Sequence, residues 1–347
     1  MIFLKIILMP FVPVYAALVA MRNWMFDKGF FKAKKVNAKV ISVGNITVGG
    51  SGKTPTVIYL AKLLKNEKKN VGVLSRGYGR RSKGYVLVRD NEKILTTVDR
   101  CGDEIFHTVQ ECEVPAAVSE KRVSGAKKMI SETNVDTLVL DDAFQHRWIY
   151  RDVDILVCEQ KFLNDPDFLN QNLLPTGNMR ENFNSINRAD TIIVNRKFSA
   201  KLELPSSLKE YAEEKNIFSA YYKSIGFVDI KRNIEYKIED FEGQKSLVVS
   251  GIANPFSFIN ALKQTKVDTQ NQIIFSDHKF YTHKEVQKIR KEFYSTNSHS
   301  VVTTQKDAVK LVKFSREMDD IDIFYLKIRL EVDEENEFRS FILDKIS

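Results

Sequence analysis

Residues 39–55 read Lys39-Val-Ile-Ser-Val-Gly44-Asn-Ile-Thr47-Val-Gly-Gly50-Ser-Gly-Lys53-Thr54-Pro55. A short β-branched run leads into a glycine-rich turn, and apolar residues at helical spacing follow it. In this context a loop can hold phosphate groups, because its backbone N–H groups and the positive end of the helix dipole point at the anion. Lys53 would reach the β- and γ-phosphate oxygens, and Thr54 would ligate Mg²⁺. The stretch therefore predicts a site for ATP or GTP, made of Thr47, Val48, Gly49, Gly50, Ser51, Gly52, Lys53 and Thr54.

The first position of this loop departs from the usual pattern. In G-x-x-x-x-G-K-[ST] that position is glycine, whereas here it is Thr47, and Gly49 and Gly50 supply the backbone freedom. Pro55 suits the first turn of the following helix, where its missing N–H has no helical partner. A loop that only caps a helix is the alternative interpretation, but the flanking strand and helix patterns favour a phosphate site.

Length, composition and charge limit the remaining choices. A chain of 347 residues with 43% hydrophobic residues can bury a large core, and at about 150 residues per domain it predicts two domains. The formal net charge of +8 indicates an anionic partner, which by charge alone is a nucleotide, a phospholipid or a nucleic acid. The 3 cysteines are scattered, which indicates a reducing compartment and predicts neither a disulfide framework nor a zinc site.

The N-terminal segment is apolar and precedes a basic stretch. Residues 1–20 carry a single charge, Lys5. A cleaved signal peptide would export a nucleotide-binding fold to a compartment without ATP, and Pro10 and Pro13 interrupt the stretch that a spanning helix would need. We expect an apolar helix lying in the cytoplasmic leaflet, with basic residues beside anionic headgroups; a helix packed on the protein's own core is the alternative. The basic residues are Arg22, Lys28, Lys32, Lys34 and Lys35.

The rest of the chain predicts a two-domain α/β protein. Short β-branched runs alternate with helical stretches, which favours a P-loop NTPase-like parallel sheet with helices on both faces. Residues 85–96 read as an inserted hairpin, and residues 220–230 and 234–238 as a connecting β-ribbon before a smaller α/β domain. The predicted strands are Val40–Val43, Val71–Leu74, Thr137–Leu140, Val153–Val157, Thr191–Val194, Leu247–Val249, Gln272–Phe275, Val301–Thr303 and Ile323–Leu330. The predicted ranges are 1–35 for the membrane-associated helix and its basic flank, 36–216 for the P-loop domain, 217–245 for the ribbon and 246–347 for the smaller domain.

An acidic strand end lies downstream of the loop. Leu138-Val-Leu140 is followed by Asp141 and Asp142, at the carboxyl edge where ligands of open α/β sheets bind. A phosphate-loop enzyme needs an acid for Mg²⁺ at that edge. Gln145 and His146 follow on the same edge and are candidate substrate contacts, although a capped helix start with a structural His146 is the alternative.

Two further segments carry groups suited to phosphate chemistry. The loop after Val71–Leu74 contains Arg76, Tyr78 and Arg80, which we expect to hold an anionic substrate; a solvated basic loop is the alternative. Its Gly-x-Gly lacks the third glycine of a dinucleotide fingerprint. Cys101-Gly-Asp-Glu104 places two acids after a glycine, and either Asp103 or Glu104 suits the carboxylate that accepts a hydroxyl proton during phosphoryl transfer.

Several ordered motifs together resemble the tetraacyldisaccharide 4'-kinase family, and the resemblance extends from the N-terminus to about Leu311. It implies a kinase that uses ATP and Mg²⁺ to phosphorylate the 4'-hydroxyl of the lipid A disaccharide 1-phosphate. It also implies an N-terminal helix at the cytoplasmic face of the inner membrane. The motifs are Gly44–Pro55, Leu74–Arg80, Gly102–Glu104, Asp141–Arg147, Leu174–Glu181, Gly251–Pro255, Asp277-His278 and Thr304–Asp307.

The resemblance also implies residue roles. Asp103 would be the catalytic base, hydrogen-bonded to His278 from the second domain, while Asp141 and Asp142 would serve Mg²⁺ and the phosphates. A histidine beside a carboxylate orients it, and as an imidazolium could store the proton taken from the hydroxyl. Because these residues lie on different predicted domains, domain closure would assemble the site.

The motif around residues 174–181 would place Arg180 and Glu181 on the substrate side, with Arg180 a candidate for anionic groups. Ile105, Asn178-Met179 and Gln305 stand where the family usually has Pro, Pro-Leu and Glu. These differences affect the assignments of Arg180, Glu181 and Lys306, and leave the nucleotide loop untouched.

Other functions remain as alternatives at this stage. A GTPase switch would need an N-K-x-D motif, and Asn195-Arg-Lys-Phe198 lacks its Asp. A membrane-associated positioning ATPase would carry an extra lysine where this chain has Val48. Nucleic-acid binding is supported only by net charge, so we expect no nucleic-acid partner.

Overall fold

Strand β1 (Lys39–Gly44), which leads into the glycine-rich loop, lies inside a large sheet between β5 (Thr137–Asp141) and β6 (Val153–Glu159), and all three run parallel. The computed structural model describes residues 5, 7–165, 171–212 and 215–347. Within this part of the chain the sheet has 13 strands in the order β11-β10-β12-β13-β8-β7-β6-β1-β5-β2-β4-β3, with β9 paired to β8. The expected parallel α/β sheet is confirmed. The remaining strands of this half are β2 (Val71–Ser75), β3 (Val86–Arg89), β4 (Ala116–Val118) and β7 (Thr191–Asn195).

Helices cover both faces of the β1 half because its strands are apolar on both sides. Ile41 and Val43 pack on one face with α3, α5 and α12, whereas Val40 packs on the other with α6. All five strands predicted for this half are present, but β4 was missed, and the expected hairpin is reduced to one bridge between Arg89 and Ile94. The helices are α3 (Lys53–Asn66), α4 (Val98–Cys101), α5 (Asp103–Cys112), α6 (Arg122–Thr133), α7 (Gln160–Leu163), η1 (Phe183–Arg188), α8 (Ser206–Ala212) and α12 (Glu335–Ile346).

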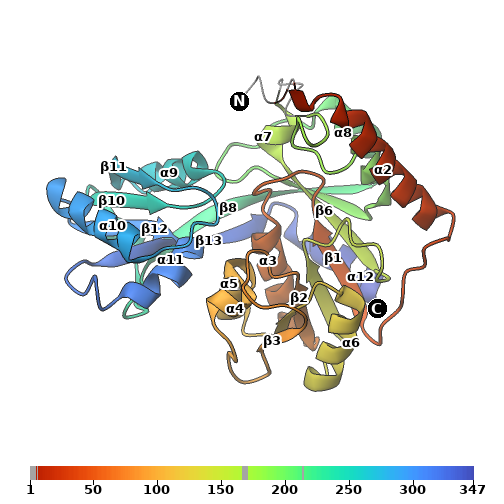
Figure 1. Ribbon diagram of the computed structural model, residues 1–347, viewed down its shortest axis with the longest axis horizontal. Coiled ribbons are helices and arrows are strands. Elements are labelled where there is room, and N and C mark those ends of the chain that lie inside the picture. The colour runs from red at the N-terminus through yellow and green to blue at the C-terminus, as the bar shows by residue number, and fades with distance from the viewer. Residues whose placement is uncertain (1–4, 6, 166–170, 213–214) are drawn as a thin grey trace.

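The second half is a smaller parallel α/β unit on the same sheet. Its strands are β10 (Lys245–Ser250), β11 (Asp268–Ile274) and β12 (Ser300–Thr304), all mutually parallel neighbours around β10. Figure 1 shows it on the left, separated from the β1 half and joined to it by long strands. Its helices are η2 (Ile238–Phe241), α9 (Pro255–Gln264), α10 (His283–Ser295), α11 (Gln305–Leu311) and η3 (Val312–Phe314).

The connecting ribbon differs from the expected one. Strand β8 (Asn216–Asp229) pairs with β9 (Glu235–Tyr236) over only two residues, and its long antiparallel partner is β13 (Ile323–Val332) from near the C-terminus. Local sequence could not reveal this pairing because the two strands are about a hundred residues apart in the chain. The chain therefore crosses from one half to the other and back along the same two-stranded ribbon (Figure 1).

The C-terminal helix returns to the first half. Phe338, Ile342 and Ile346 of α12 are buried in the same apolar cluster as β1 and α3, although the predicted range 246–347 assigns them to the smaller domain. The ring of Phe338 lies 5.0 Å from that of Phe218 and 6.0 Å from that of Tyr59. Burial of this apolar face requires the β1 half, so α12 belongs with that core.

Helix α2 (Phe11–Asp27) lies along the outside of the β1 half (Figure 1). Phe26 is its one buried residue, and its exposed apolar side chains include Phe11, Val14, Leu18 and Trp24. Among the described residues, no helix combines the length and apolar character needed to cross a bilayer. The predicted apolar segment 1–20 begins outside the described residues, which omit 1–4 and 6.

Candidate active site

The predicted phosphate loop joins the end of β1 to the start of α3. Gly49 and Gly52 have φ angles of 102° and 106°, a conformation that glycine adopts without strain. A Cβ atom at Gly49 or Gly50 would meet nothing within 4 Å, so the outer side of the loop is open. The N–H of Val48 donates to the carbonyl of Asn178 at 2.7 Å, which fixes the loop from one side. The geometry is that of an open cradle at a helix N-terminus, as an anion requires.

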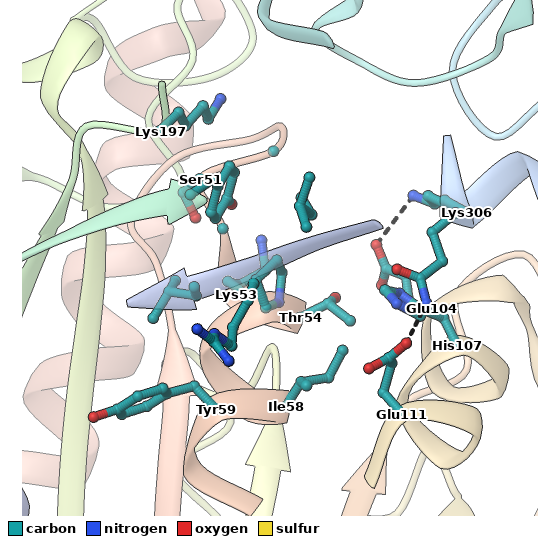
Figure 2. Close-up of a pocket in the computed structure, with 18 of the residues that line it drawn as sticks. Ser51, Lys53, Thr54, Ile58, Tyr59, Glu104, His107, Glu111, Lys197 and Lys306 are labelled. Carbon is teal, nitrogen blue, oxygen red and sulfur yellow. Dashed lines mark hydrogen bonds and ion pairs between the residues drawn. The ribbon is translucent and has the colours of Figure 1, made fainter. Parts of the chain in front are cut away.

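The loop faces a cleft of about 1500 Å³ that both halves of the molecule line. Figure 2 shows Lys53 and Thr54 at the start of α3, with Glu104 and His107 of α5 and Lys306 of α11 on the other side. The ribbon strand β13 forms part of the wall. A ligand in this cleft would contact both halves, so binding and closure would be coupled.

Lys53 and Asp142 form part of a charged group beside the loop. The Nζ atom of Lys53 lies 3.6 Å from Oδ1 of Asp142, whose two oxygens accept from Nη1 of Arg180 at 2.9 and 3.1 Å. Burial alone would raise the pKa of Asp142, but the charges of Lys53 and Arg180 lower it. Asp142 is thus an ionised carboxylate already committed to two cations.

Asp141 is the opposite case. It is buried, and neither of its carboxylate oxygens has a hydrogen-bond partner. Burial, followed by the charges of Glu104 and Asp142, raises its pKa to about 7. An unpartnered carboxylate is costly to bury, so the site is suited to a cation. No cluster of three or more His, Cys, Asp or Glu side chains in the described residues is arranged for a metal. Mg²⁺ needs none, since it takes one or two carboxylates and completes its shell with phosphate oxygens and water.

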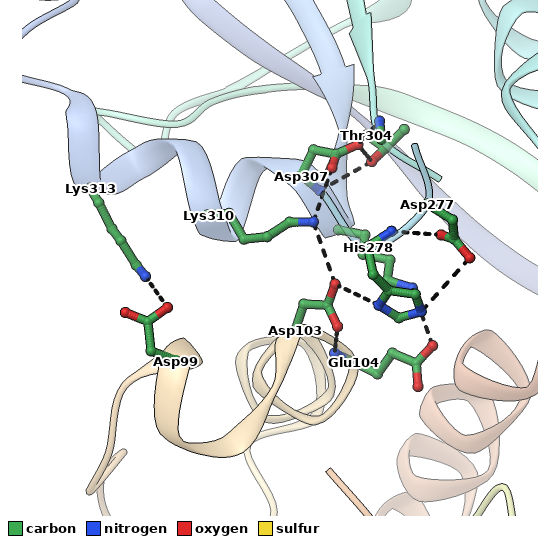
Figure 3. A network of polar contacts seen from close by, with 11 residues as sticks. Asp99, Asp103, Glu104, Asp277, His278, Thr304, Asp307, Lys310 and Lys313 are labelled. Atoms are coloured by element: carbon green, nitrogen blue, oxygen red, sulfur yellow. Dashed lines mark hydrogen bonds and ion pairs between the residues drawn. The ribbon is translucent and has the colours of Figure 1, made fainter. Parts of the chain in front are cut away.

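Asp103 and His278 come together as predicted by the resemblance. Nδ1 of His278, from the second half, lies 3.3 Å from Oδ2 of Asp103 at the start of α5 (Figure 3). Lys310 of α11 lies 3.5 Å from the same oxygen, and the N–H of Glu104 donates to Oδ1 at 3.0 Å. His278 has a φ of 53°, an uncommon conformation for a non-glycine residue. The ring itself is oriented by its contacts with Asp103, Lys306 and Tyr78.

Lys306 contacts the other ring nitrogen of this histidine. Its Nζ atom lies 3.1 Å from Nε2 of His278 and 3.2 Å from Oε1 of Glu104. Although burial opposes it, the charges of Glu104 and Asp103 raise the pKa of Lys306, so the ammonium donates to Nε2. With Nε2 accepting from Lys306, Nδ1 is the ring nitrogen that donates to Asp103. Oδ2 of Asp277 lies 3.9 Å from the same Nε2 atom, so both ring nitrogens of His278 face charged groups.

Asp103 itself is buried and ionised. Burial would raise its pKa, but the hydrogen bond from His278 and then the charges of Lys306 and Lys310 hold the pKa well below its usual range. Residue spacing did not decide whether Asp103 or Glu104 is the proton-accepting carboxylate. In the structure Asp103 is bonded to His278, while Glu104 is paired with Lys306. Lys306 lies in the Thr304–Asp307 motif of the family resemblance, whereas Lys310 is a network member that the sequence did not indicate.

The loop of residues 75–81 was expected to hold an anionic substrate through Arg76, Tyr78 and Arg80, but not all three side chains are available. Tyr78 is 66% exposed with its ring 4.9 Å from that of His278, and Arg76 is also exposed. The Arg80 side chain is only 3% exposed, and its Nη2 atom donates to Glu120 at 2.5 Å and to the carbonyl of Gly84 at 2.6 Å. Arg80 therefore holds the loop together, while Arg76 is free to meet an anion.

Gln145 and His146, the candidate substrate contacts after the acidic pair, are not among the described residues that line the cleft. Nε2 of Gln145 donates to the carbonyl of Asn45 at 2.8 Å, which ties it to the base of the phosphate loop. Burial lowers the pKa of His146 to about 4, and its Nε2 atom is buried without a partner. Arg122, which the sequence did not indicate, is 2% exposed and donates to the carbonyl of Asp141 at 3.2 Å.

Arg180 and Glu181 connect the site to α2, and Arg180 also lines the cleft. Beyond its pairing with Asp142, Arg180 accepts at its carbonyl a 2.8 Å hydrogen bond from the hydroxyl of Tyr15. Glu181 is 1% exposed, and its Oε2 atom accepts from Asn23 of α2 at 3.0 Å and from Arg188 at 2.7 Å. Both residues thus position the helix and the acidic pair.

The departures from the family pattern are accommodated locally. Ile105 is 1% exposed in the core, and Met179 is 5% exposed beside the loop, where it bridges to Thr47. Gln305 donates to Glu111 across the two halves. None of the three disturbs the phosphate loop.

Comparison with known proteins gives one family. The model of the family described as tetraacyldisaccharide-1-P 4'-kinase matches residues 4–347. The tetraacyldisaccharide 4'-kinase of Cytophaga hutchinsonii is 35% identical over 323 residues, which cover 92% of this chain and 88% of that protein. The Aquifex aeolicus protein of the same name is 30% identical over 339 residues, 96% of this chain and 97% of that protein. The crystal structure of the "apo" form of LpxK from Aquifex aeolicus in complex with ATP matches with a TM-score of 0.81 at 29% identity, over 99% of this chain and 100% of that one.

Proposed function

This chain belongs to the tetraacyldisaccharide-1-P 4'-kinase family, and we propose that it moves the γ-phosphate of ATP to the 4'-hydroxyl of tetraacyldisaccharide 1-phosphate with Asp103 as the base. It is an ATP-dependent kinase of lipid A biosynthesis. The observation that carries the residue assignment is the meeting of Asp103 and His278 across the two halves, beside the cleft that the phosphate loop faces.

The nucleotide would lie with its triphosphate over residues 47–54. The open side of Gly49 and Gly50 leaves room for phosphate oxygens, and Lys53 supplies a positive charge. Thr54 and Asp141 fit Mg²⁺, because Asp141 offers two unpartnered oxygens, and Asp142 adds charge while it orients Lys53. When bound, Mg²⁺ would neutralise charge on the phosphates.

The acceptor hydroxyl would be positioned by Asp103. Its Oδ2 atom is held by His278 and Lys310, which leaves the carboxylate ionised and fixed in direction. The ring of Tyr78 lies beside that of His278, and Arg76 is exposed on the same loop, so we assign the sugar and its anionic group to this side of the cleft. Because His278 comes from the second half, the base is complete only when the halves are closed.

The direct test is formation of 4'-phosphorylated product from γ-labelled ATP and purified protein. We expect transfer to the lipid in one-to-one proportion with ATP consumption, with Lys53→Ala inactive. Asp103→Ala and His278→Ala should each lower turnover by at least about 100-fold while the ATP dissociation constant stays within about 3-fold. Equal loss of nucleotide affinity would refute the role of Asp103 and His278. Release of inorganic phosphate without lipid product would instead indicate a switching or positioning ATPase.

Association with the cytoplasmic leaflet of the inner membrane belongs to the same proposal. The exposed apolar face of α2 continues into exposed aromatic residues: Phe30 is 66% exposed, Trp148 40% and Tyr150 43%. The ring of Trp148 packs 4.9 Å from that of Phe31, and Nζ of Lys35 lies 4.6 Å from the ring of Tyr150. Aromatic residues with lysines beside an apolar helix suit the interface of an anionic bilayer.

Fluorescence can test this surface because Trp24 and Trp148 are the chain's 2 tryptophans and both lie on it. Trp24→Phe and Trp148→Phe each leave one reporter. With vesicles of phosphatidylglycerol and brominated phosphatidylcholine, we expect quenching of both single-tryptophan proteins. Quenching of Trp24 alone would restrict the membrane contact to α2, and quenching of neither would refute it.

A further inference from the structure

We propose that Asn195 and Tyr222 are positioning residues that hold the phosphate loop from behind and set its affinity for ATP. Asn195 is the last residue of β7 and is fully buried. Tyr222 lies on β8, the strand that leads out of the β1 half into the ribbon. Neither residue has a role in the phosphoryl-transfer chemistry derived above, yet together they contact the centre of the loop.

Asn195 bonds to the loop backbone directly. Its Nδ2 atom donates to the carbonyl of Ser51 and to the hydroxyl of Tyr222, each at 3.0 Å. Its Oδ1 atom accepts from the N–H of Lys197 at 2.9 Å, so both ends of the amide are used. The orientation of the amide is therefore determined, and with it the position of the Ser51 carbonyl. The Ser51 carbonyl belongs to the peptide whose N–H is that of Gly52, within the phosphate cradle.

Tyr222 completes the contact from the ribbon. Its hydroxyl accepts from Asn195, and its backbone N–H donates to the carbonyl of Lys197 at 2.8 Å. The phenol packs edge-to-face on Phe198 with ring centroids 5.5 Å apart. The side chain is thus fixed at both ends, and it transmits the position of β8 to the loop through one amide.

The space behind the loop shows how closely the three groups fit. A Cβ atom at Gly52 would lie 2.0 Å from Nδ2 of Asn195 and 2.7 Å from the hydroxyl oxygen of Tyr222. Gly49 and Gly50, on the open side, have no such neighbour within 4 Å. The loop is therefore pressed against protein on one side only, which leaves the other side for phosphate. Asn178 holds the loop at Val48, and Asn195 and Tyr222 hold it at Ser51 and Gly52.

This arrangement gives a role to a motif that the sequence left unexplained. Asn195-Arg-Lys197 looks like the first part of a guanine-reading N-K-x-D motif but lacks the Asp. In the structure the amide of Asn195 donates to the phosphate loop. Nζ of Lys197 forms an ion pair with Glu159 at 2.8 Å. The asparagine thus binds the phosphate loop, whereas in an N-K-x-D motif it would bind the guanine base of a nucleotide. The proposal rests on nucleotide binding at this loop but not on the identity of the acceptor.

The test compares Tyr222→Phe, which removes only the hydroxyl, with Tyr221→Phe as the matched control. Tyr221 is the next residue on β8, and its hydroxyl donates to Glu331 at 2.6 Å, away from the loop. ATP dissociation constants come from calorimetry without lipid, and KM for ATP and kcat from the kinase assay. We expect Tyr222→Phe to raise both the dissociation constant and the KM for ATP by about 5- to 10-fold, as for one lost neutral hydrogen bond. Tyr221→Phe should stay within about 2-fold.

A double-mutant cycle tests the pathway through Asn195. Asn195→Ala should raise KM for ATP more than Tyr222→Phe does, by about 20- to 50-fold, because the bond to Ser51 is also lost. The double variant should match Asn195→Ala alone, since Tyr222 acts through the amide. Thermal unfolding of each variant without nucleotide is the stability control.

Three results would overturn the proposal. These are an unchanged KM for ATP in Tyr222→Phe, effects that multiply in the double variant, or a lowered melting temperature with loss confined to kcat, as a purely structural role would give. Calorimetry needs no acceptor, so it tests this proposal separately from the proposed function. If the ATP dissociation constants of the variants change as expected but the protein has no kinase activity, only the proposed function is refuted.

Discussion

Removal of the Lys306 ammonium is the sharpest perturbation of the proposed base. Lys306→Met keeps the length of the side chain and deletes its charge and its donor. In the structure the ammonium bonds to Nε2 of His278 at 3.1 Å and to Glu104 at 3.2 Å. Without it Nε2 has no fixed donor, so the ring can adopt the tautomer in which Nδ1 no longer donates to Asp103.

The magnitude follows from the kind of bond lost. A hydrogen bond to a charged group contributes about 1.5–3 kcal/mol, and each 1.4 kcal/mol corresponds to a factor of ten in rate. If this energy orients His278 in the transition state, kcat should fall by about 10- to 150-fold. Lys306→Arg, which keeps the charge, should recover part of the loss.

The pH profile of kcat/KM for Lys306→Met should also shift in a predictable direction. Lys306 is one of the groups that hold the pKa of Asp103 below its usual range, so its removal should raise that pKa. The base is active when ionised, and the acid limb of kcat/KM should therefore move to higher pH. A simple loss of folded protein would instead scale the whole profile and leave the acid limb where it is.

Lys313→Met is the matched control for this experiment. Lys313 follows shortly after α11 and makes a comparable ion pair across the two halves, 2.5 Å from Asp99, but it touches no member of the base network (Figure 3). We measure kcat and kcat/KM with saturating ATP from pH 3 to 9, a range that extends below the usual pKa of an aspartate. The reasoning fails if Lys306→Met shows the same kcat and the same acid limb as Lys313→Met.

Three further predictions concern the loop, the core and the pH dependence of stability. Gly52→Ala should weaken ATP binding at least about 30-fold by calorimetry, because φ is 106° and the new Cβ would lie 2.0 Å from Asn195; near-normal binding would contradict the loop geometry. Phe338→Ala should lower the free energy of unfolding in urea by about 3–5 kcal/mol, since the ring is fully buried, and a loss below about 1 kcal/mol would show that α12 is not part of the β1 core. Burial raises the pKa of Asp154 to about 6, from about 3.9 when unfolded, so its contribution to stability is present below pH 4 and lost as pH rises to 6. Asp154→Asn should remove up to about 3 kcal/mol of that pH dependence. If the free energies of unfolding of wild type and variant change with pH in parallel, this prediction is wrong.

The nucleotide half could be predicted from sequence because its signals are local. The β-branched run before Gly44 and the helical spacing after Lys53 lie within one stretch, and the structure places β1 and α3 there. The acidic pair could be placed for the same reason, at the end of an apolar strand. Sequence did not show that Asp141 and Asp142 differ, because the difference comes from burial and from Arg180, a residue distant in the chain.

Long-range contacts could not be predicted from the residues alone. Spacing left Asp103 and Glu104 equivalent, and only the family resemblance paired Asp103 with His278. Arg80 was expected to face an anion, but the structure occupies it with Glu120, an acid 40 positions away that no local pattern connects to it. The pairing of β8 with β13 could not be predicted for the same physical reason. Strand partners are determined by tertiary burial and not by residues nearby in the sequence.

The low pKa of Asp103 constrains how it can act as a base. A carboxylate stabilised by His278, Lys306 and Lys310 has little driving force for removing a proton from a hydroxyl. In a loose phosphoryl-transfer transition state, however, the nucleophile forms little bond before the phosphate leaves, so the hydroxyl proton is lost late. The advantage of Asp103 is then direction: it stays ionised, accepts the hydroxyl hydrogen bond and keeps the oxygen in line. A variant that raises its pKa should gain base strength and still lose rate, because the same change frees His278; a rise in kcat for Lys306→Met would instead show that proton removal limits the reaction.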